Sequence, residues 1–324
     1  MTQRLVRARH GAAAVPGATT PWDRIHYRIH HPALFSDRAE ERQTGQLPPD
    51  LELAPWPVVI ILNGINVGPD GYRWVATLLA AHGIAAVTFT HVGEVTPGEI
   101  GLSPGLDLSA LTPGEFRSRP SATAVGPLLD ALAAEHRSGP LAGLLDLDRV
   151  VLGGHSAGGT VALLNADRRW FPSVVATFAY AGHTMPATLL GHPEGTVLPI
   201  GDDMPALVAG GTADGVVAAS AVRYGAEGSD RHDPLAATFE HGATAPRSVF
   251  ALIDGAGHLL FCDPVDPTTA RGFLEPEPGP GTAARRDLLG RLVVSFCAEQ
   301  LGIKAPETLS TLANDPLIAG FRVR

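Results

Sequence analysis

The stretch VVLGGHSAGG, residues 150–159, decides the fold of this chain. It opens with three apolar residues that predict a short buried strand over 150–152, and a helix is expected to follow as far as about Ala166. Residues 154–158 match the pattern Gly-x-Ser-x-Gly. Because small residues on both sides let the strand and the helix approach closely, we expect Ser156 to stand on a sharp turn with its hydroxyl exposed.

Strands and helices alternate on both sides of this turn. Apolar runs predict further strands at 25–31, 58–62, 84–90, 174–180, 206–209 and 249–253. Helices are expected at 70–82, 120–136 and about 283–301, and a polar, proline-rich loop at 36–56. The alternation predicts an α/β fold with a mostly parallel central sheet covered by helices on both faces.

Neither an internal repeat nor a low-complexity linker divides the chain, so we expect a single domain over residues 23–304. Residues 1–22 are expected to form a flexible N-terminal arm, and residues 305–324 a C-terminal tail. Two irregular stretches, about 91–119 and 215–246, are expected to be long loop insertions. Because long loops in compact domains usually serve a function, we expect them to shape a pocket.

The chain is acidic, with 24 basic against 33 acidic residues and a formal net charge of −9. Nucleic acid and anionic membrane surfaces need a basic face, so we expect neither as a partner. No run approaches the roughly 20 apolar residues of a membrane span, and the N-terminal segment lacks the apolar centre of a signal peptide. These features predict a soluble, cytoplasmic protein. Lys304 is the only lysine, which together with abundant Ala, Gly and Pro suggests a GC-rich bacterial genome.

The two cysteines, Cys262 and Cys297, show no spacing typical of a metal site, so we expect no bound metal. Two reduced thiols are the simpler interpretation. A disulfide that joins the loop after His258 to the last helix is the alternative. The sequence leaves the oligomeric state open.

A serine hydroxyl is a weak nucleophile unless a base activates it. In folds with this turn, an acid and then a histidine follow the serine along the chain. His258 lies in a short glycine-rich loop after the strand expected at 249–253, and Asp214 follows the strand expected at 206–209. Catalytic groups gather at such carboxyl ends of parallel strands. We predict Ser156 as nucleophile, His258 as base and Asp214 as the orienting acid.

Two backbone amides are expected to hold the negative charge that develops on a substrate carbonyl oxygen. The amide of Ala157 lies directly after the serine, and the amide of Ile65 lies in the loop after the strand at 58–62. The side chains of Asn63 and Asn66 are expected either to hold that loop or to take part directly. Candidate substrate contacts are Asn66, His155 and His183.

These motifs resemble the dienelactone-hydrolase-like branch of the α/β-hydrolases, and more closely its bacterial cutinase, chlorophyllase and platelet-activating-factor acetylhydrolase group. The segments that carry the resemblance are PWPVVIILNGIN (55–66), AAHGIAAVTFTH (80–91), GGHSAGG (153–159), VAGGTADGVV (208–217) and LIDGAGHLLF (252–261). The resemblance covers about residues 24–302. It implies the α/β-hydrolase fold, and hydrolysis of carboxylic esters through an acyl-enzyme with neither metal nor organic cofactor. It also implies Ile65 and Ala157 as oxyanion donors.

Three departures limit what the resemblance implies. Asn63-Gly64 stands where many relatives have His-Gly, the export signal of secreted cutinases is missing, and the two insertions are long. We therefore expect a small or medium ester as substrate. A thioesterase, a lactonase or an acyltransferase would use the same three residues, and a catalytically silent binding protein is the alternative from another class.

Overall fold

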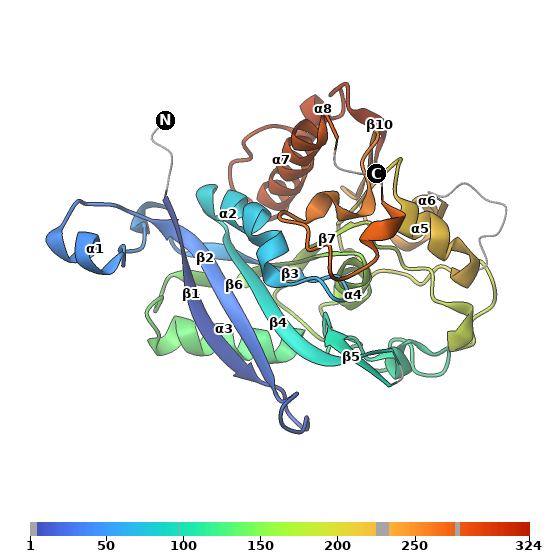
Figure 1. The fold of residues 1–324 in the computed structure, drawn as a ribbon, viewed down its shortest axis with the longest axis horizontal. Helices are drawn as coiled ribbons and strands as arrows, with labels where there is room; N and C mark the ends of the chain where they lie inside the picture. The colour runs from blue at the N-terminus through green and yellow to red at the C-terminus, as the bar shows by residue number, and fades with distance from the viewer. Residues whose placement is uncertain (1–4, 97, 225–232, 276–278) are drawn as a thin grey trace.

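Ten strands form one mixed sheet in the computed structural model, which describes residues 5–96, 98–224, 233–275 and 279–324 (Figure 1). The order across the sheet is β1-β2-β4-β3-β6-β7-β8-β9-β10, and β5 pairs with β4. Strand bounds are β1 Leu5–Ala14, β2 Arg24–Ala33, β3 Trp56–Leu62, β4 Ala85–Thr96, β5 Glu99–Leu102, β6 Leu145–His155, β7 Val174–Tyr180, β8 Ala206–Gly211, β9 Val249–Ile253 and β10 Ile318–Val323. Neighbours from β4 to β9 run parallel, and β1, β2, β5 and β10 pair antiparallel.

Helices cover both faces of the sheet, which confirms the predicted α/β class. On one face α3 (Val125–Ser138) and α4 (Ala157–Asn165) pack on the sheet through a shared apolar core. On the other face α2 (Arg73–Ala81) and α7 (Thr282–Gln300) do the same. The shorter helices are α1 (Ala39–Thr44), α5 (Gly215–Ser220), α6 (Asp233–Ala237) and α8 (Leu309–Leu312). Figure 1 shows α1 at one end of the molecule and α5 and α6 at the other.

The central strands match their sequence patterns because continuous apolar runs are what a doubly covered strand needs. All seven residues of β3 are buried. The strand predicted at 150–152 is longer, since β6 runs from Leu145 to His155. Its first half carries the polar residues of Leu145–Arg149 and is partly exposed, so no apolar run marked it. The helix predicted from residue 120 begins at Val125.

The predicted N-terminal arm is wrong for residues 5–14, which form β1 and pair with β2 along their whole length. Most β1 side chains are exposed or half-buried. The strand is therefore held mainly by main-chain hydrogen bonds, which need no apolar pattern in the sequence. At Gly11 a Cβ atom would lie 2.3 Å from the Tyr27 ring, so the two strands pack closely there.

The predicted C-terminal tail is also wrong, because its last residues form β10 beside β9. The Arg322 guanidinium lies 4.3 Å from the centre of the Phe250 ring. Arg291 of α7 pairs with Glu307 and Asp315, at 3.0 and 2.8 Å. These contacts fasten residues 305–324 to the domain.

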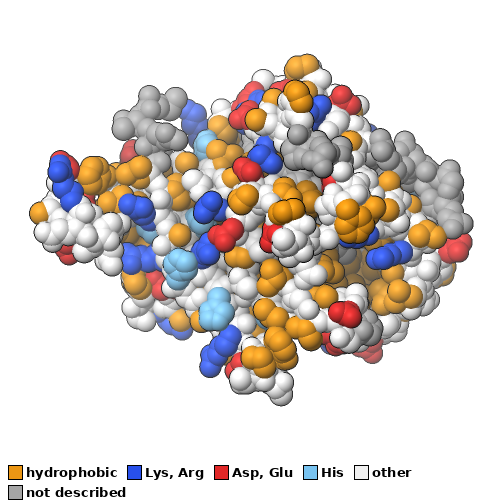
Figure 2. Space-filling model, viewed as in Figure 1, with side chains coloured by type: hydrophobic (Ala, Val, Ile, Leu, Met, Phe, Trp, Pro, Cys, Tyr) orange, Lys and Arg blue, Asp and Glu red, His pale blue; other side chains and the backbone are white. Residues whose placement is uncertain are grey.

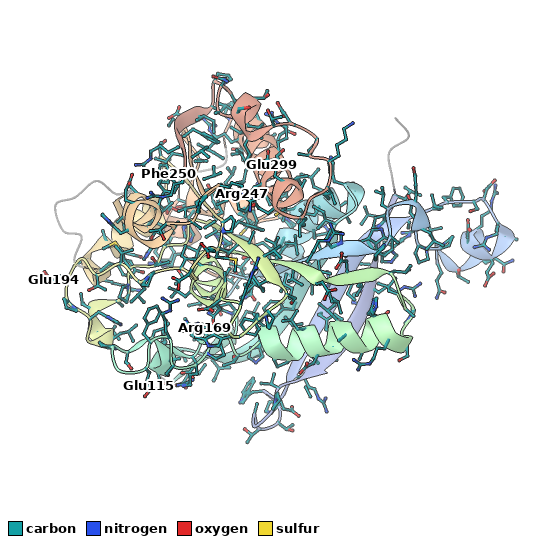
Figure 3. All side chains as sticks on the ribbon, turned by 180° about the vertical axis from the view of Figure 1, so that it is seen from behind. Glu115, Arg169, Glu194, Arg247, Phe250 and Glu299 are labelled. Atoms are coloured by element: carbon teal, nitrogen blue, oxygen red, sulfur yellow. The ribbon has the colours of Figure 1, made fainter. Side chains whose placement is uncertain are left out.

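The two predicted loop insertions contain regular structure. The first, 91–119, holds the end of β4, the strand β5 and a 3-10 turn at Leu108–Leu111. The second, 215–246, holds α5 and α6, and its residues 225–232 lie outside the described residues. Figure 3 places Glu115 and Glu194 on neighbouring segments at the same end of the molecule. There the His192 ring hydrogen-bonds to the Leu111 carbonyl oxygen at 2.7 Å.

Cys262 and Cys297 are both free and buried, so the interpretation as two thiols is confirmed and the disulfide is wrong. Among the described residues, no helix is both long enough and apolar enough to cross a bilayer.

Candidate active site

Ser156 stands on the sharp turn between β6 and α4, as predicted. Its backbone φ is positive, at 55° with ψ −126°, a conformation that costs energy in a residue with a Cβ atom. The turn needs its glycines for close approach. A Cβ on Gly154 would lie 2.4 Å from the Gly158 backbone, and one on Gly158 would lie 2.2 Å from the Leu62 carbonyl oxygen. These contacts give the Gly-x-Ser-x-Gly pattern its physical reason.

Asp214 and His258, 44 residues apart in sequence, meet beyond the carboxyl ends of β8 and β9. The Nδ1–H group of His258 donates to Asp214 Oδ2 at 2.9 Å, and Asp214 Oδ1 accepts from the Val217 amide at 2.7 Å. Both side chains are buried. Burial acts to raise the pKa of the Asp214 carboxyl, but the charge and hydrogen bond of His258 lower it overall. With Nδ1 committed to the carboxylate, Nε2 of His258 is left to accept a proton.

Ser156 and His258 line one cavity of about 400 Å³, and Asp214 is hydrogen-bonded to His258. Ile65 and Ala157 line the same cavity. Ala157 is the first residue of α4, where an amide has no partner within its own helix. Within the described part of the chain, the Ile65 amide has no hydrogen-bond acceptor either. Both amides therefore suit the predicted oxyanion role.

The asparagines hold the loop after β3, which was one of the two alternatives. Asn63 Nδ2 donates to the Gly64 carbonyl at 2.9 Å. Asn66 Oδ1 accepts from the Leu102 amide at 3.0 Å, and the Asn66 amide donates to the Leu102 carbonyl at 2.9 Å. Asn66 lines the cavity, but its oxygen serves to dock β5 onto this loop.

His155, predicted as a substrate contact, is among the residues that line the cavity, and both of its ring nitrogens are engaged within the protein. Its Nε2–H donates to the His258 carbonyl at 2.9 Å, and its Nδ1 accepts from the Tyr72 hydroxyl at 3.0 Å. The Tyr72 oxygen in turn accepts from the Gly64 amide at 2.8 Å. Burial, and then the charge of His258, lower the pKa of His155 to about 3, so the ring is neutral. This chain of bonds joins the loops that carry Ile65, Ser156 and His258.

His183 lies in the cavity wall after β7 and is buried. Its ring meets the edge of the Tyr224 ring, with centroids 4.3 Å apart. Nδ1 is buried and has no hydrogen-bond partner among the described residues. Burial lowers the pKa of His183 to about 4. His183 therefore lies in the cavity wall, and its contact with substrate stays a prediction.

Sequence reasoning missed Glu275, which ties the acid loop to the histidine loop. One carboxylate oxygen accepts from the Gly215 amide at 3.1 Å, and the other accepts from the Leu259 amide at 3.3 Å. Burial, and then the charge of Asp214, raise the pKa of Glu275. No local motif marks this residue, because its role depends on contacts across 60 residues of sequence. Arg223 and Arg271 of the cavity wall were missed for the same reason.

Among the described residues, no group of three or more histidine, cysteine or carboxylate side chains could hold a metal ion. No protein-family model matches the sequence, and no curated protein matches it. The chemistry of the site is therefore inferred from its own residues.

Proposed function

We propose that this protein is a serine hydrolase of the α/β-hydrolase fold, which cleaves a carboxylic ester through an acyl-enzyme. The observation that carries the proposal is the 2.9 Å hydrogen bond between His258 Nδ1 and Asp214 Oδ2, beside a cavity shared with Ser156. The serine turn and the chain order Ser, Asp, His support the fold assignment.

In the first half-reaction His258 Nε2 takes the proton of Ser156 Oγ as the oxygen attacks the ester carbonyl carbon. The amides of Ile65 and Ala157 hold the negative carbonyl oxygen of the tetrahedral intermediate. His258 then gives its proton to the leaving alcohol oxygen as the carbon–oxygen bond breaks. Asp214 stays ionised and stabilises the imidazolium.

In the second half-reaction a water molecule attacks the acyl carbon of the Ser156 ester. His258 Nε2 takes a proton from the water and returns one to Ser156 Oγ when the acid departs. The cavity is lined mainly by apolar side chains, which suits the carbon chain of a small or medium ester.

A fluorophosphonate probe tests the proposal, since it labels only an activated serine. We expect the native protein to be labelled at Ser156 and to hydrolyse 4-nitrophenyl butyrate. Ser156→Ala should lose both properties, while Ser36→Ala, which changes an exposed serine, should keep them. Hydrolysis of acyl-CoA thioesters and of lactones, measured beside that of the ester, tests the thioesterase and lactonase alternatives. An unlabelled native protein, or an undiminished label in Ser156→Ala, would overturn the proposal.

A further inference from the structure

The cavity beside Ser156 has walls of two different kinds. One wall is apolar and comes from α4 and from the segments 91–119 and 183–205. Its leucines include Leu106, Leu111, Leu164, Leu190 and Leu198, which form one packed cluster. The other wall follows Asp214 along α5 and includes Ser220, Arg223, Tyr224 and Arg271. Figure 2 shows a hollow over this part of the molecule, bordered mainly by hydrophobic side chains with basic side chains beside it.

Arg271 is half-buried in this wall and lies close to a second arginine. Its Nη1 donates to Ser220 Oγ at 2.9 Å. Burial, and then the positive charge of Arg223, lower the pKa of Arg271. Arg223 and Arg271 both line the cavity, and their like charges repel each other. Arg223 is exposed, so the cost of burying a charge falls on Arg271.

Within residues 5–96, 98–224, 233–275 and 279–324, neither Arg223 nor Arg271 forms an ion pair with a carboxylate. The carboxylates close by are already engaged. Asp214 binds His258 and the Val217 amide, and both oxygens of Glu275 accept from backbone amides. Among the residues that the structure describes, this second wall therefore has positive charge to offer to a ligand.

We propose that Arg271 and Arg223 form a subsite for an anionic group of the substrate, so that the substrate class is an ester with both an apolar portion and a carboxylate or phosphate. A guanidinium fork can bind either oxyanion with two parallel hydrogen bonds. The apolar wall with its leucines binds the apolar portion of the substrate. The ester bond then lies at Ser156, between the two walls. This inference rests on the proposed hydrolase function.

Matched esters test the subsite, because each pair differs only in charge. In the first pair, 4-hexanoyloxybenzoate is compared with 4-hexanoyloxybenzamide, so that the alcohol part carries the charge. In the second, the 4-nitrophenyl monoester of glutaric acid is compared with that of glutaramic acid, so that the acyl part carries it. A further probe, 4-hexanoyloxyphenyl phosphate, separates phosphate from carboxylate.

In at least one comparison we expect kcat/KM for the anionic ester to exceed that for its neutral partner by about tenfold or more. Arg271→Gln should bring this ratio down to about one, and Arg271→Lys should keep part of it. Arg7→Gln, which removes an exposed arginine on β1 far from the cavity, should leave the ratio unchanged.

A native protein that shows no preference for the anionic ester in any comparison would overturn the subsite, and so would a ratio that survives in Arg271→Gln. Hydrolysis of the neutral esters reports separately on the proposed function, since it needs Ser156 and not the arginines. If no ester is cleaved and Ser156 is not labelled, the hydrolase proposal itself fails.

Discussion

At the scale of single residues, a few short contacts build the site. Sequence patterns predict some of the residues that make these contacts and miss others. Ser156, Asp214 and His258 could be predicted because a local motif and a fixed chain order mark them. His155 and Glu275 could not, because each is defined by partners far away in the sequence. From the sequence, His155 is predicted to contact substrate. Its position beside Ser156 gives no sign that both ring nitrogens are hydrogen-bonded within the protein.

The three candidate catalytic residues should lose activity in a fixed order. We expect Ser156→Ala to lower kcat for 4-nitrophenyl butyrate by on the order of 10⁴–10⁶, and His258→Ala to do the same, because nucleophile and base act as one unit. Asp214→Ala should cost less, since Asp214 orients the ring and stabilises its charge. Steady-state kinetics measure the losses, and circular dichroism checks the fold. A smaller loss for His258→Ala than for Asp214→Ala would contradict these roles.

The Tyr72 hydroxyl should matter for both stability and turnover. Tyr72→Phe leaves the Gly64 amide and the His155 Nδ1 atom without their buried partner. We expect the free energy of unfolding to fall by about 1–3 kcal/mol and kcat to fall more than KM changes, since the loops of Ile65 and His258 loosen. Urea denaturation and steady-state kinetics measure the two effects.

Tyr27→Phe is the matched control for that change, because Tyr27 is a buried tyrosine on β2, the strand next to the edge strand β1. It should leave kcat unchanged. Equal kinetic losses in both variants would mean that the Tyr72 hydroxyl does not position the site.

At the scale of elements, the sequence predicts the strands that are buried on both faces. It misses the strands that are held mainly by main-chain hydrogen bonds. Strands β3, β4, β7, β8 and β9 carry apolar runs and were predicted. The edge strand β1 is largely exposed, so nothing in its pattern separates it from a flexible arm. The strand β10 was missed likewise, because half-buried and exposed side chains make up its whole length.

The packing of α4 on β3 should tolerate no side chain at Gly158. A Cβ there would lie 2.2 Å from the Leu62 carbonyl oxygen, so Gly158→Ala must push the helix away from the strand. We expect the free energy of unfolding of this variant, measured by urea denaturation, to fall by about 2 kcal/mol or more. The variant should also lose most fluorophosphonate labelling, because Ala157 moves with the helix.

Gly126→Ala provides the comparison, since a Cβ at Gly126 in α3 meets nothing within 4 Å. It should be neutral or stabilise the protein by up to about 1 kcal/mol. If both variants behaved alike, close approach at the serine turn would not be what limits residue 158.

At the scale of the whole molecule, several histidines are buried in their neutral form. The pKa is lowered to about 4 for His30 and His183 and to about 3 for His155, mainly by burial. The unfolded chain therefore binds more protons than the folded one below pH of about 6.5. Their stabilisation is complete above that pH and is lost as the pH falls toward 4, by up to about 1.4 kcal/mol per pH unit for each histidine.

Urea midpoints measured from pH 8 to pH 4 check this expectation. They should be flat at the upper end and fall steeply below pH 6.5. His183→Phe should flatten the fall, because it removes one of the groups that take up a proton on unfolding. A stability that rises between pH 6 and pH 4 would contradict the neutral burial of these rings.

The hydrogen bond from His155 to the His258 carbonyl joins residues 103 apart in sequence. During synthesis from the N-terminus, the serine turn leaves the ribosome long before the segment that carries its base. At a rate of about 5–20 residues per second, several seconds separate the two events. In that interval the nascent chain carries Ser156 without His258, so the proposed nucleophile has no base to activate it. On the proposed function, the protein stays inactive until β9 and the histidine loop have been made.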